Sequence, residues 1–174
     1  MLYVSFCFHV HQPFRLKHYS IFEIGKNLHY FDDELNERIM KRAAEKCYLP
    51  MNELLLKQIR KFEGAFKVAF SITGTFIEGA KEFKPDVLHS FKELGREGGV
   101  EFMGETYYHS LACIFDEEEF IEQVRMHSEL IEREFGVKPV TFRNTELVYS
   151  NRVSDLVAQL PNFKVVLLEG TERV

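Results

Sequence analysis

Residues 66–73, FKVAFSIT, alternate large apolar side chains with small or polar ones. Val68, Phe70 and Ile72 are the large members, and this two-residue period is typical of a β-strand with two different faces. Residues 2–8, LYVSFCF, alternate in the same way. Together they predict a sheet whose apolar outer face meets helices, while its small and polar inner face leads into a lined crevice.

Helix-like segments separate these two strands from three further ones along the chain. The expected helices span residues 34–47, 50–63, 85 to about 97, 116–136 and 152–160, and the further strands span 100–103, 140–143 and 163–168. This repeated strand–helix order predicts an α/β fold with parallel strands and right-handed crossovers. Five strands are too few to close a (β/α) barrel, which usually needs roughly 250 residues. A complete open sheet and part of a larger barrel both remain possible.

The chain has 174 residues and a net charge of −5, with its lysines interspersed among acidic residues. We therefore expect one globular core and no nucleic-acid partner. No apolar run approaches the roughly 20 residues of a membrane span, the opening residues do not resemble a signal peptide, and no linker-like stretch marks an internal boundary. The three cysteines show no C-x-x-C spacing, so a reduced, cytoplasmic chain with no membrane partner is expected.

Polar residues gather at the end of every predicted strand. These ends read FHVHQP (8–13), SITGTF (71–76), MGETYYHS (103–110), FRNTE (142–146) and LLEGTE (167–172). In parallel α/β folds the carboxyl ends of the strands lie at one edge, and chemistry collects there. The sequence therefore predicts a functional site built from these segments.

Two histidines and two glutamates are the leading candidates. His9 and His11 are two residues apart, so in extended backbone they share a face and could line a polar pocket or bind a metal such as zinc. The alternative is that each is a buried histidine satisfied by the backbone. Glu105 follows the third strand, where it could act on a ligand or serve as a helix cap or salt-bridge partner.

Glu146 stands where the fourth strand is expected to end. Its neighbours Arg143, Asn144 and Thr145 could hydrogen-bond its carboxylate and hold it ionised. Strict alternation would place Glu146 on the outer face with Phe142, so a functional role requires the strand to end or bulge near Asn144.

Three segments, in this order, resemble the first three conserved regions of glycoside hydrolase family 57: FHVHQPFRL (8–16), GVEFMGETYYHSL (99–111) and FRNTELVY (142–149). The resemblance extends over essentially the whole chain. It implies that residues 1–174 are the N-terminal part of an incomplete (β/α)7-type barrel of which about five strands are present. The implied activity is cleavage or transfer of α-glucan chains with retention of configuration, as in α-amylases and 4-α-glucanotransferases, with no cofactor and no metal.

The resemblance also implies roles for individual residues. Glu146 corresponds to the catalytic nucleophile, and the implied substrate-binding residues are His9, His11, Gln12, Glu105 and Arg143. The family's acid/base is an aspartate in a fourth region that has no match in this chain. We therefore expect the chain alone to be inactive or weakly active, and to self-associate through an exposed sheet edge.

Two other functions compete with this hypothesis. A metal-dependent polysaccharide hydrolase of the deacetylase type would use His9 and His11 as ligands, although the chain lacks the paired aspartates of that type. A non-catalytic domain that binds maltodextrins is the other alternative. An α-glucan or maltooligosaccharide is the expected partner of both the family 57 enzyme and the non-catalytic domain.

Overall fold

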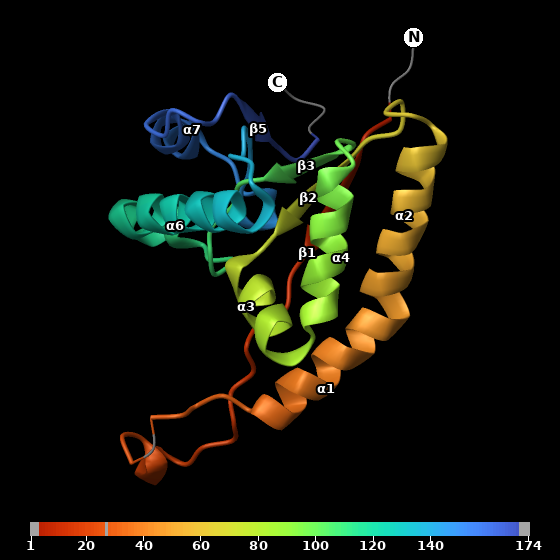
Figure 1. Ribbon diagram of the computed structural model, residues 1–174. Coiled ribbons are helices and arrows are strands. Elements are labelled where there is room, and N and C mark those ends of the chain that lie inside the picture. Colours follow the sequence, from red (N-terminus) through yellow and green to blue (C-terminus); the bar gives the residue numbers. More distant parts are fainter. Residues whose placement is uncertain (1–3, 27, 171–174) are drawn as a thin grey trace.

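The computed structural model describes residues 4–26 and 28–170, in which strands alternate with helices (Figure 1). The strands are β1 (Phe6–Val10), β2 (Val68–Ile72), β3 (Val100–Met103), β4 (Thr141–Arg143) and β5 (Val165–Leu167). β2 to β5 fall within predicted segments, and β1 overlaps the segment predicted at 2–8 and ends two residues beyond it, so the α/β class is confirmed. Leu2 and Tyr3, expected in the first strand, lie outside the described residues.

All strand pairings are parallel, as the strand–helix rhythm predicts. One sheet has the order β1-β2-β3, and β4 pairs with β5. Gly104 joins the two sheets: its N–H donates to the Thr141 carbonyl and its own carbonyl accepts from Arg143 N–H, both at 2.8 Å. A Cβ at this glycine would come within 2.5 Å of the Phe163 ring, so any larger residue at the junction would displace that ring.

The helices agree with the predicted segments at three places and differ at three, one of which is a short helix at Ala112–Phe115 that was not predicted. They are α1 (Asp33–Ala43), α2 (Leu49–Lys61), α3 (Gly74–Phe83), α4 (Pro85–Arg96), α5 (Ala112–Phe115), α6 (Glu117–Phe135) and α7 (Asn151–Ala158). Short helical turns are η1 (Ile21–Glu23), η2 (Ala44–Tyr48) and η3 (Thr145–Leu147). The two helices expected over 34–63 are joined without a break by η2, a π-helical turn. Helix α3 was not predicted, and it begins where the Thr73 side chain caps it by accepting from Phe76 N–H.

One face of the β1-β2-β3 sheet packs against helices α2, α4 and α6, which the apolar alternation predicts (Figure 1). Phe70 of β2 meets Phe91 of α4 edge-to-face at 5.3 Å, and Phe102 of β3 stacks on Phe135 of α6 at 3.9 Å. Phe6 of β1, on the same face, is 51% exposed because β1 pairs only with β2 among the described residues. The core therefore lies between the helices and the two inner strands, β2 and β3.

A second apolar cluster anchors β4. Phe142 is fully buried and meets Phe120 of α6 edge-to-face at 5.9 Å, while Val153 and Leu156 of α7 complete the cluster. This packing holds the fourth strand against the sheet and so determines where the residues after Arg143 emerge.

All three cysteines are free, with Cys7 and Cys47 exposed and Cys113 buried. Within residues 4–26 and 28–170, no helix is both long and apolar enough to cross a membrane.

A buried carboxylate ties three outer helices together and makes stability depend on pH. Glu134 of α6 is 7% exposed and pairs with Lys81 of α3 at 2.5 Å and Lys92 of α4 at 2.9 Å. Burial by itself raises the pKa of Glu134, but the two lysines outweigh it and lower the pKa below its ordinary value. The contribution of these two ion pairs to the free energy of unfolding is therefore fully present above about pH 4.5. It is lost as the pH falls through the lowered pKa of Glu134.

We expect Glu134→Gln to reduce the free energy of unfolding by about 1–3 kcal/mol at pH 7, because both lysines lose their charged partner. The deficit should shrink as the pH falls through the lowered pKa of Glu134, because wild-type Glu134 then becomes protonated as well. Urea unfolding over a series of pH values from 7 downward measures both effects. Glu132→Gln, at an exposed glutamate on the same helix, is the control, and an equal loss in both variants would contradict the prediction.

Candidate active site

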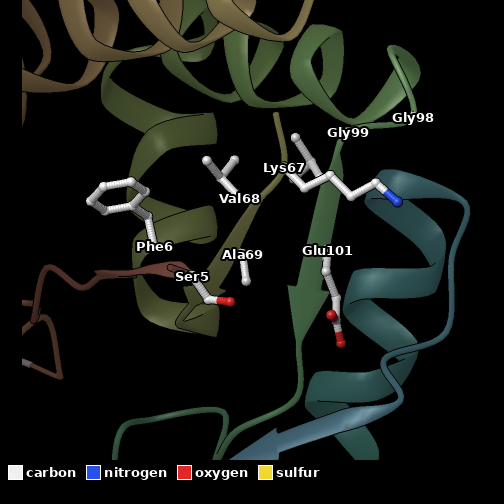
Figure 2. Close-up of a pocket in the computed structure, with 9 residues that line it drawn as sticks. Ser5, Phe6, Lys67, Val68, Ala69, Gly98, Gly99 and Glu101 are labelled. Atoms are coloured by element: carbon white, nitrogen blue, oxygen red, sulfur yellow. The ribbon is translucent and has the colours of Figure 1, made fainter. Parts of the chain in front are cut away.

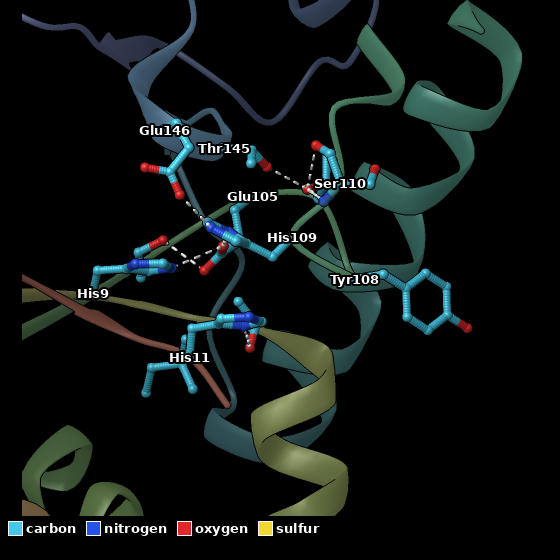
Figure 3. A network of polar contacts seen from close by, with 12 residues as sticks. His9, His11, Glu105, Tyr108, His109, Ser110, Thr145 and Glu146 are labelled. Atoms are coloured by element: carbon cyan, nitrogen blue, oxygen red, sulfur yellow. Dashed lines mark hydrogen bonds and ion pairs between the residues drawn. The ribbon is translucent and has the colours of Figure 1, made fainter. Parts of the chain in front are cut away.

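Five side chains converge at the carboxyl ends of β1, β3 and β4, and we call them the imidazole–carboxylate cluster (Figure 3). They are His9, His11, Glu105, His109 and Glu146. Segments nearly 140 residues apart in the sequence meet here because parallel strands end at the same edge. Four of the five were predicted site residues, and His109 was not.

Glu105 is the buried centre of the cluster, with a side chain that is 0% exposed. One carboxylate oxygen, Oε1, accepts a 2.6 Å hydrogen bond from the Ser71 hydroxyl of β2. The other, Oε2, lies 3.6 Å from His9 Nε2 and 3.5 Å from His109 Nδ1. Burial by itself raises the pKa of Glu105, but the imidazoles of His109 and His9 outweigh it and lower the pKa to about 2.

His109 connects the buried glutamate with an exposed one. Its Nε2 lies 3.0 Å from Glu146 Oε1, while the Glu146 side chain is 73% exposed and open to solvent. This contact with His109 lowers the pKa of Glu146 and keeps its carboxylate ionised. The pKa of His109 is raised in turn, chiefly by Glu105 and then by Glu146, against the effect of burial.

Both partners of this contact have left-handed backbone. His109 has φ 55° and Glu146 has φ 51°, a conformation that costs most L-residues roughly 1–2 kcal/mol. Strand β4 ends at Arg143, and η3 then turns Glu146 away from the face of Phe142. The strand thus ends directly before Asn144, which a functional role of Glu146 requires, and backbone strain of this kind clusters at functional sites.

Hydroxyl groups hold the two loops in place. Thr106, after β3, and Thr145, after β4, are both buried, and their Oγ1 atoms lie 2.9 Å apart. Thr106 Oγ1 also accepts from Ser110 N–H at 2.9 Å, and the Ser110 hydroxyl donates to Gln123 Oε1 of α6 at 2.9 Å. These bonds fix the backbone on either side of His109 and so hold its imidazole in position.

His11 completes the cluster from the first strand. Its ring lies parallel to that of His9 at 5.9 Å, and its Nδ1 is 3.0 Å from Thr73 Oγ1. Burial and the neighbouring His109 and His9 lower the pKa of His11 to about 4, so this imidazole is neutral at pH 7. It can therefore both donate and accept hydrogen bonds.

His127 of α6 supports the cluster from behind. It is fully buried, with Nε2 2.7 Å from the Ile72 carbonyl and Nδ1 3.3 Å from Glu105 N–H. A carbonyl can only accept and a backbone N–H can only donate, so Nε2 carries the proton and Nδ1 is unprotonated. Burial lowers the pKa of His127, which agrees with this neutral form.

The remaining predicted residues lie beside the cluster. Gln12 contacts Tyr48 and Arg15, on the side of η2, rather than the imidazoles. Arg143 is the last residue of β4, and its charge makes only a minor contribution to the lowered pKa of Glu146. Of the expected neighbours of Glu146, Asn144 instead donates to the Val148 carbonyl.

The sequence shows that His109 follows the third strand, but hydrophobic periodicity does not predict where its side chain points. It lies in the polar segment after β3, four residues beyond Glu105, but no strand or helix period defines where such a loop residue points. Only the turn from Thr106 to His109 brings the ring back over the glutamate.

An open cavity of about 420 Å³ lies at the opposite ends of the strands (Figure 2). Lys67 and Glu101 are its charged lining residues, and Ser5, Ala69 and the glycine pair at 98–99 line much of the rest. This cavity has no cluster of imidazoles or carboxylates. The chemistry is therefore concentrated at the carboxyl ends of the strands.

The fold and the cluster define an α/β protein with parallel strands and a carboxylate–imidazole site at their carboxyl ends. The family model of glycosyl hydrolase family 57 matches residues 5–174. The chain belongs to this family.

Relatives of the chain are named as alpha-amylases. A candidate alpha-amylase of Methanocaldococcus jannaschii is 44% identical over 174 residues, which is 98% of this chain and 36% of the relative. An alpha-amylase of Pyrococcus abyssi is 32% identical over 91 residues, covering 52% of this chain and 13% of the relative. The chain thus spans little more than a third of the length of the first relative and less of the second.

Solved structures share the fold at low sequence identity. A 4-alpha-glucanotransferase of Thermococcus litoralis has a TM-score of 0.70 at 20% identity, covering 95% of this chain and 22% of that protein. The alpha-amylase AmyC of Thermotoga maritima has a TM-score of 0.67 at 15% identity, covering 94% of this chain and 39% of that protein. The arrangement of strands and helices described above is therefore shared with these two structures.

Proposed function

We propose that this chain is the N-terminal part of the catalytic domain of a retaining glycoside hydrolase or transglycosylase that acts on α-glucans. The observation that carries the proposal is Glu146, an exposed, ionised carboxylate held by His109 at the carboxyl ends of the strands. We further propose that the five strands form part of an incomplete (β/α)7-type barrel with no boundary within residues 1–174.

In the proposed reaction Glu146 is the nucleophile. Its free carboxylate oxygen attacks the anomeric carbon, a glycosyl–enzyme ester forms, and the bond to the leaving-group oxygen breaks as that oxygen takes a proton from an acid. Water, or the hydroxyl of a second glucan, then attacks the same carbon from the opposite face and gives its proton to the conjugate base of that acid. The ester bond to Glu146 breaks in this step, so the carboxylate is regenerated and the configuration is retained. The lowered pKa of Glu146 suits the first step because only the ionised carboxylate is nucleophilic.

The imidazoles suit recognition of a sugar. His9 is partly exposed at the site, and neutral His11 beside it offers a donor or an acceptor to a hydroxyl group. Glu105 is fully buried, so we propose that it acts on the substrate by orienting His9 and His109 rather than by touching the glucan. Gln12 and Arg143, at the margins of the cluster, are proposed to contact more distant sugar hydroxyls.

The second carboxyl group of a retaining mechanism has no assigned residue in this chain. A general acid typically contributes about 10²–10⁴-fold to the rate, so we propose that the chain alone is inactive or weakly active. Among the described residues, β1 pairs only with β2 and β5 only with β4, which supports the proposed self-association through open sheet edges. A cytoplasmic location is part of the same proposal.

Maltoheptaose cleavage followed by proton NMR tests the function. We expect an active polypeptide that contains this chain to release products that are first observed as the α-anomer, because two inversions retain the configuration. Cellooligosaccharides, which have the opposite anomeric linkage, are the control and should not be cleaved. Initial release of the β-anomer from maltoheptaose, or equal cleavage of both sugars, would contradict the proposal.

A further inference from the structure

Two buried ligand atoms in the cluster have no hydrogen-bond partner among the described residues. They are Glu105 Oε2 and His109 Nδ1, which face each other at 3.5 Å. His9 Nε2 lies 3.6 Å from the same glutamate oxygen. Buried polar atoms are nearly always satisfied in folded proteins, so two orphaned atoms that face each other need an explanation.

The distances are too long for good hydrogen bonds and fit a shared cation. Nitrogen–oxygen hydrogen bonds are usually 2.7–3.2 Å long, so a proton placed between these atoms would bind them weakly. A Zn²⁺ ion with ligand bonds of about 2.0–2.2 Å separates its tetrahedral ligands by about 3.3–3.6 Å. The spacings of 3.5 and 3.6 Å have this length, and all three atoms lie within 4.8 Å of one another.

The atoms around the three ligands orient them as metal sites require. Ser71 donates to Glu105 Oε1 and leaves Oε2 free to face inward. Glu146 accepts from His109 Nε2, which requires the proton of a neutral His109 to be on Nε2 and leaves Nδ1 unprotonated. A carboxylate behind a ligating histidine is a common feature of zinc sites.

We propose that His9 Nε2, Glu105 Oε2 and His109 Nδ1 bind one divalent transition-metal ion of the zinc type. Two imidazoles and one carboxylate are the ligand types that such ions prefer, and three protein ligands leave a coordination position open. The ligand set differs from the His9–His11 pair considered from the sequence, because His11 Nδ1 contacts Thr73 instead. The site goes beyond the proposed glycosidase function, since it requires no catalysis by Glu146.

Calorimetric titration of the chelator-treated chain with Zn²⁺ tests this site. We expect one ion per chain, with at least tenfold weaker binding in Glu105→Gln and in His9→Ala, each of which removes a ligand. Co²⁺ should give the intense visible absorption of a tetrahedral ion in the wild type and lose it in both variants. Glu105 is buried, so circular dichroism must show that its variant is folded, whereas His9 is partly exposed and provides the second, milder substitution.

His89→Ala is the matched control. His89 Nε2 lies 3.6 Å from Glu93 Oε1, the same spacing as in the proposed site, but this pair is exposed on α4 and has no third ligand nearby among the described residues. The proposal predicts that its loss leaves Zn²⁺ affinity unchanged. It is overturned if the wild type binds no Zn²⁺, if both ligand variants bind as tightly as the wild type, or if His89→Ala weakens binding equally. None of these readouts depends on glucan cleavage, so they separate this proposal from the proposed function.

Discussion

Replacing Glu146 with glutamine should abolish turnover of α-glucans in an active polypeptide that contains this chain. The amide has nearly the same shape but cannot form the glycosyl ester, so kcat should fall on the order of 10⁴-fold or more. Glu146 is 73% exposed and its only side-chain hydrogen bond in the described structure is to His109. We therefore expect the fold and the affinity for maltooligosaccharides to remain nearly unchanged.

Azide provides a direct check on the role of Glu146. In this variant the negative charge that would repel an anion is gone, so a small external nucleophile can attack the anomeric carbon once, which inverts the configuration. We expect azide to restore cleavage by Glu146→Gln and to give the inverted azido sugar. Glu122→Gln, at an exposed glutamate of α6, is the control and should keep wild-type activity. Wild-type turnover by Glu146→Gln would exclude Glu146 as the nucleophile.

Replacing Phe91 with alanine should destabilise the protein by about 3–5 kcal/mol. Phe91 is fully buried on α4, where its ring meets Phe70 at 5.3 Å, Phe76 at 5.9 Å and Tyr48 at 6.4 Å. These contacts connect β2 with three helical segments, so truncation leaves a cavity at the centre of the main core. A loss of this size is a large part of the total stability of most domains, which is about 5–15 kcal/mol.

Urea unfolding followed by circular dichroism measures the loss, and Phe115 supplies the control. Phe115 is 85% exposed at the end of α5, so Phe115→Ala should change the free energy of unfolding by less than about 0.5 kcal/mol. Equal unfolding midpoints for the two variants would show that Phe91 does not contribute the expected ~3–5 kcal/mol to the free energy of unfolding.

The elements with strong local patterns were predicted well. The alternation in 66–73 located β2, and the acidic start and apolar stripe of 116–136 located α6 almost to the residue. Prediction failed at two places where neighbours outweigh local pattern. Residues 44–48 continue the helix through a π-turn although Pro50 suggests a new start, and α3 begins directly after β2 because Thr73 caps it.

The candidate site was predicted only in part, because contacts between distant segments position some of its residues. His9 and Glu146 were expected at strand ends, and the structure brings them to one cluster. Gln12 was expected with them but contacts Tyr48 instead, because the chain leaves the sheet after Val10. His109 was missed because a loop residue has no period from which its direction can be read.

The sequence by itself determined the order and type of most elements, the polar strand ends and the position of Glu146 where β4 ends. These features depend on residues that are close together in the sequence. Hydrophobic periodicity and the residue types at segment ends therefore predict them directly. Only the tertiary structure decided that His109 lies between Glu105 and Glu146. That arrangement depends on the junction at Gly104, on the Thr106–Thr145 contact and on left-handed backbone at both partners, all of which arise from packing between segments distant in the chain.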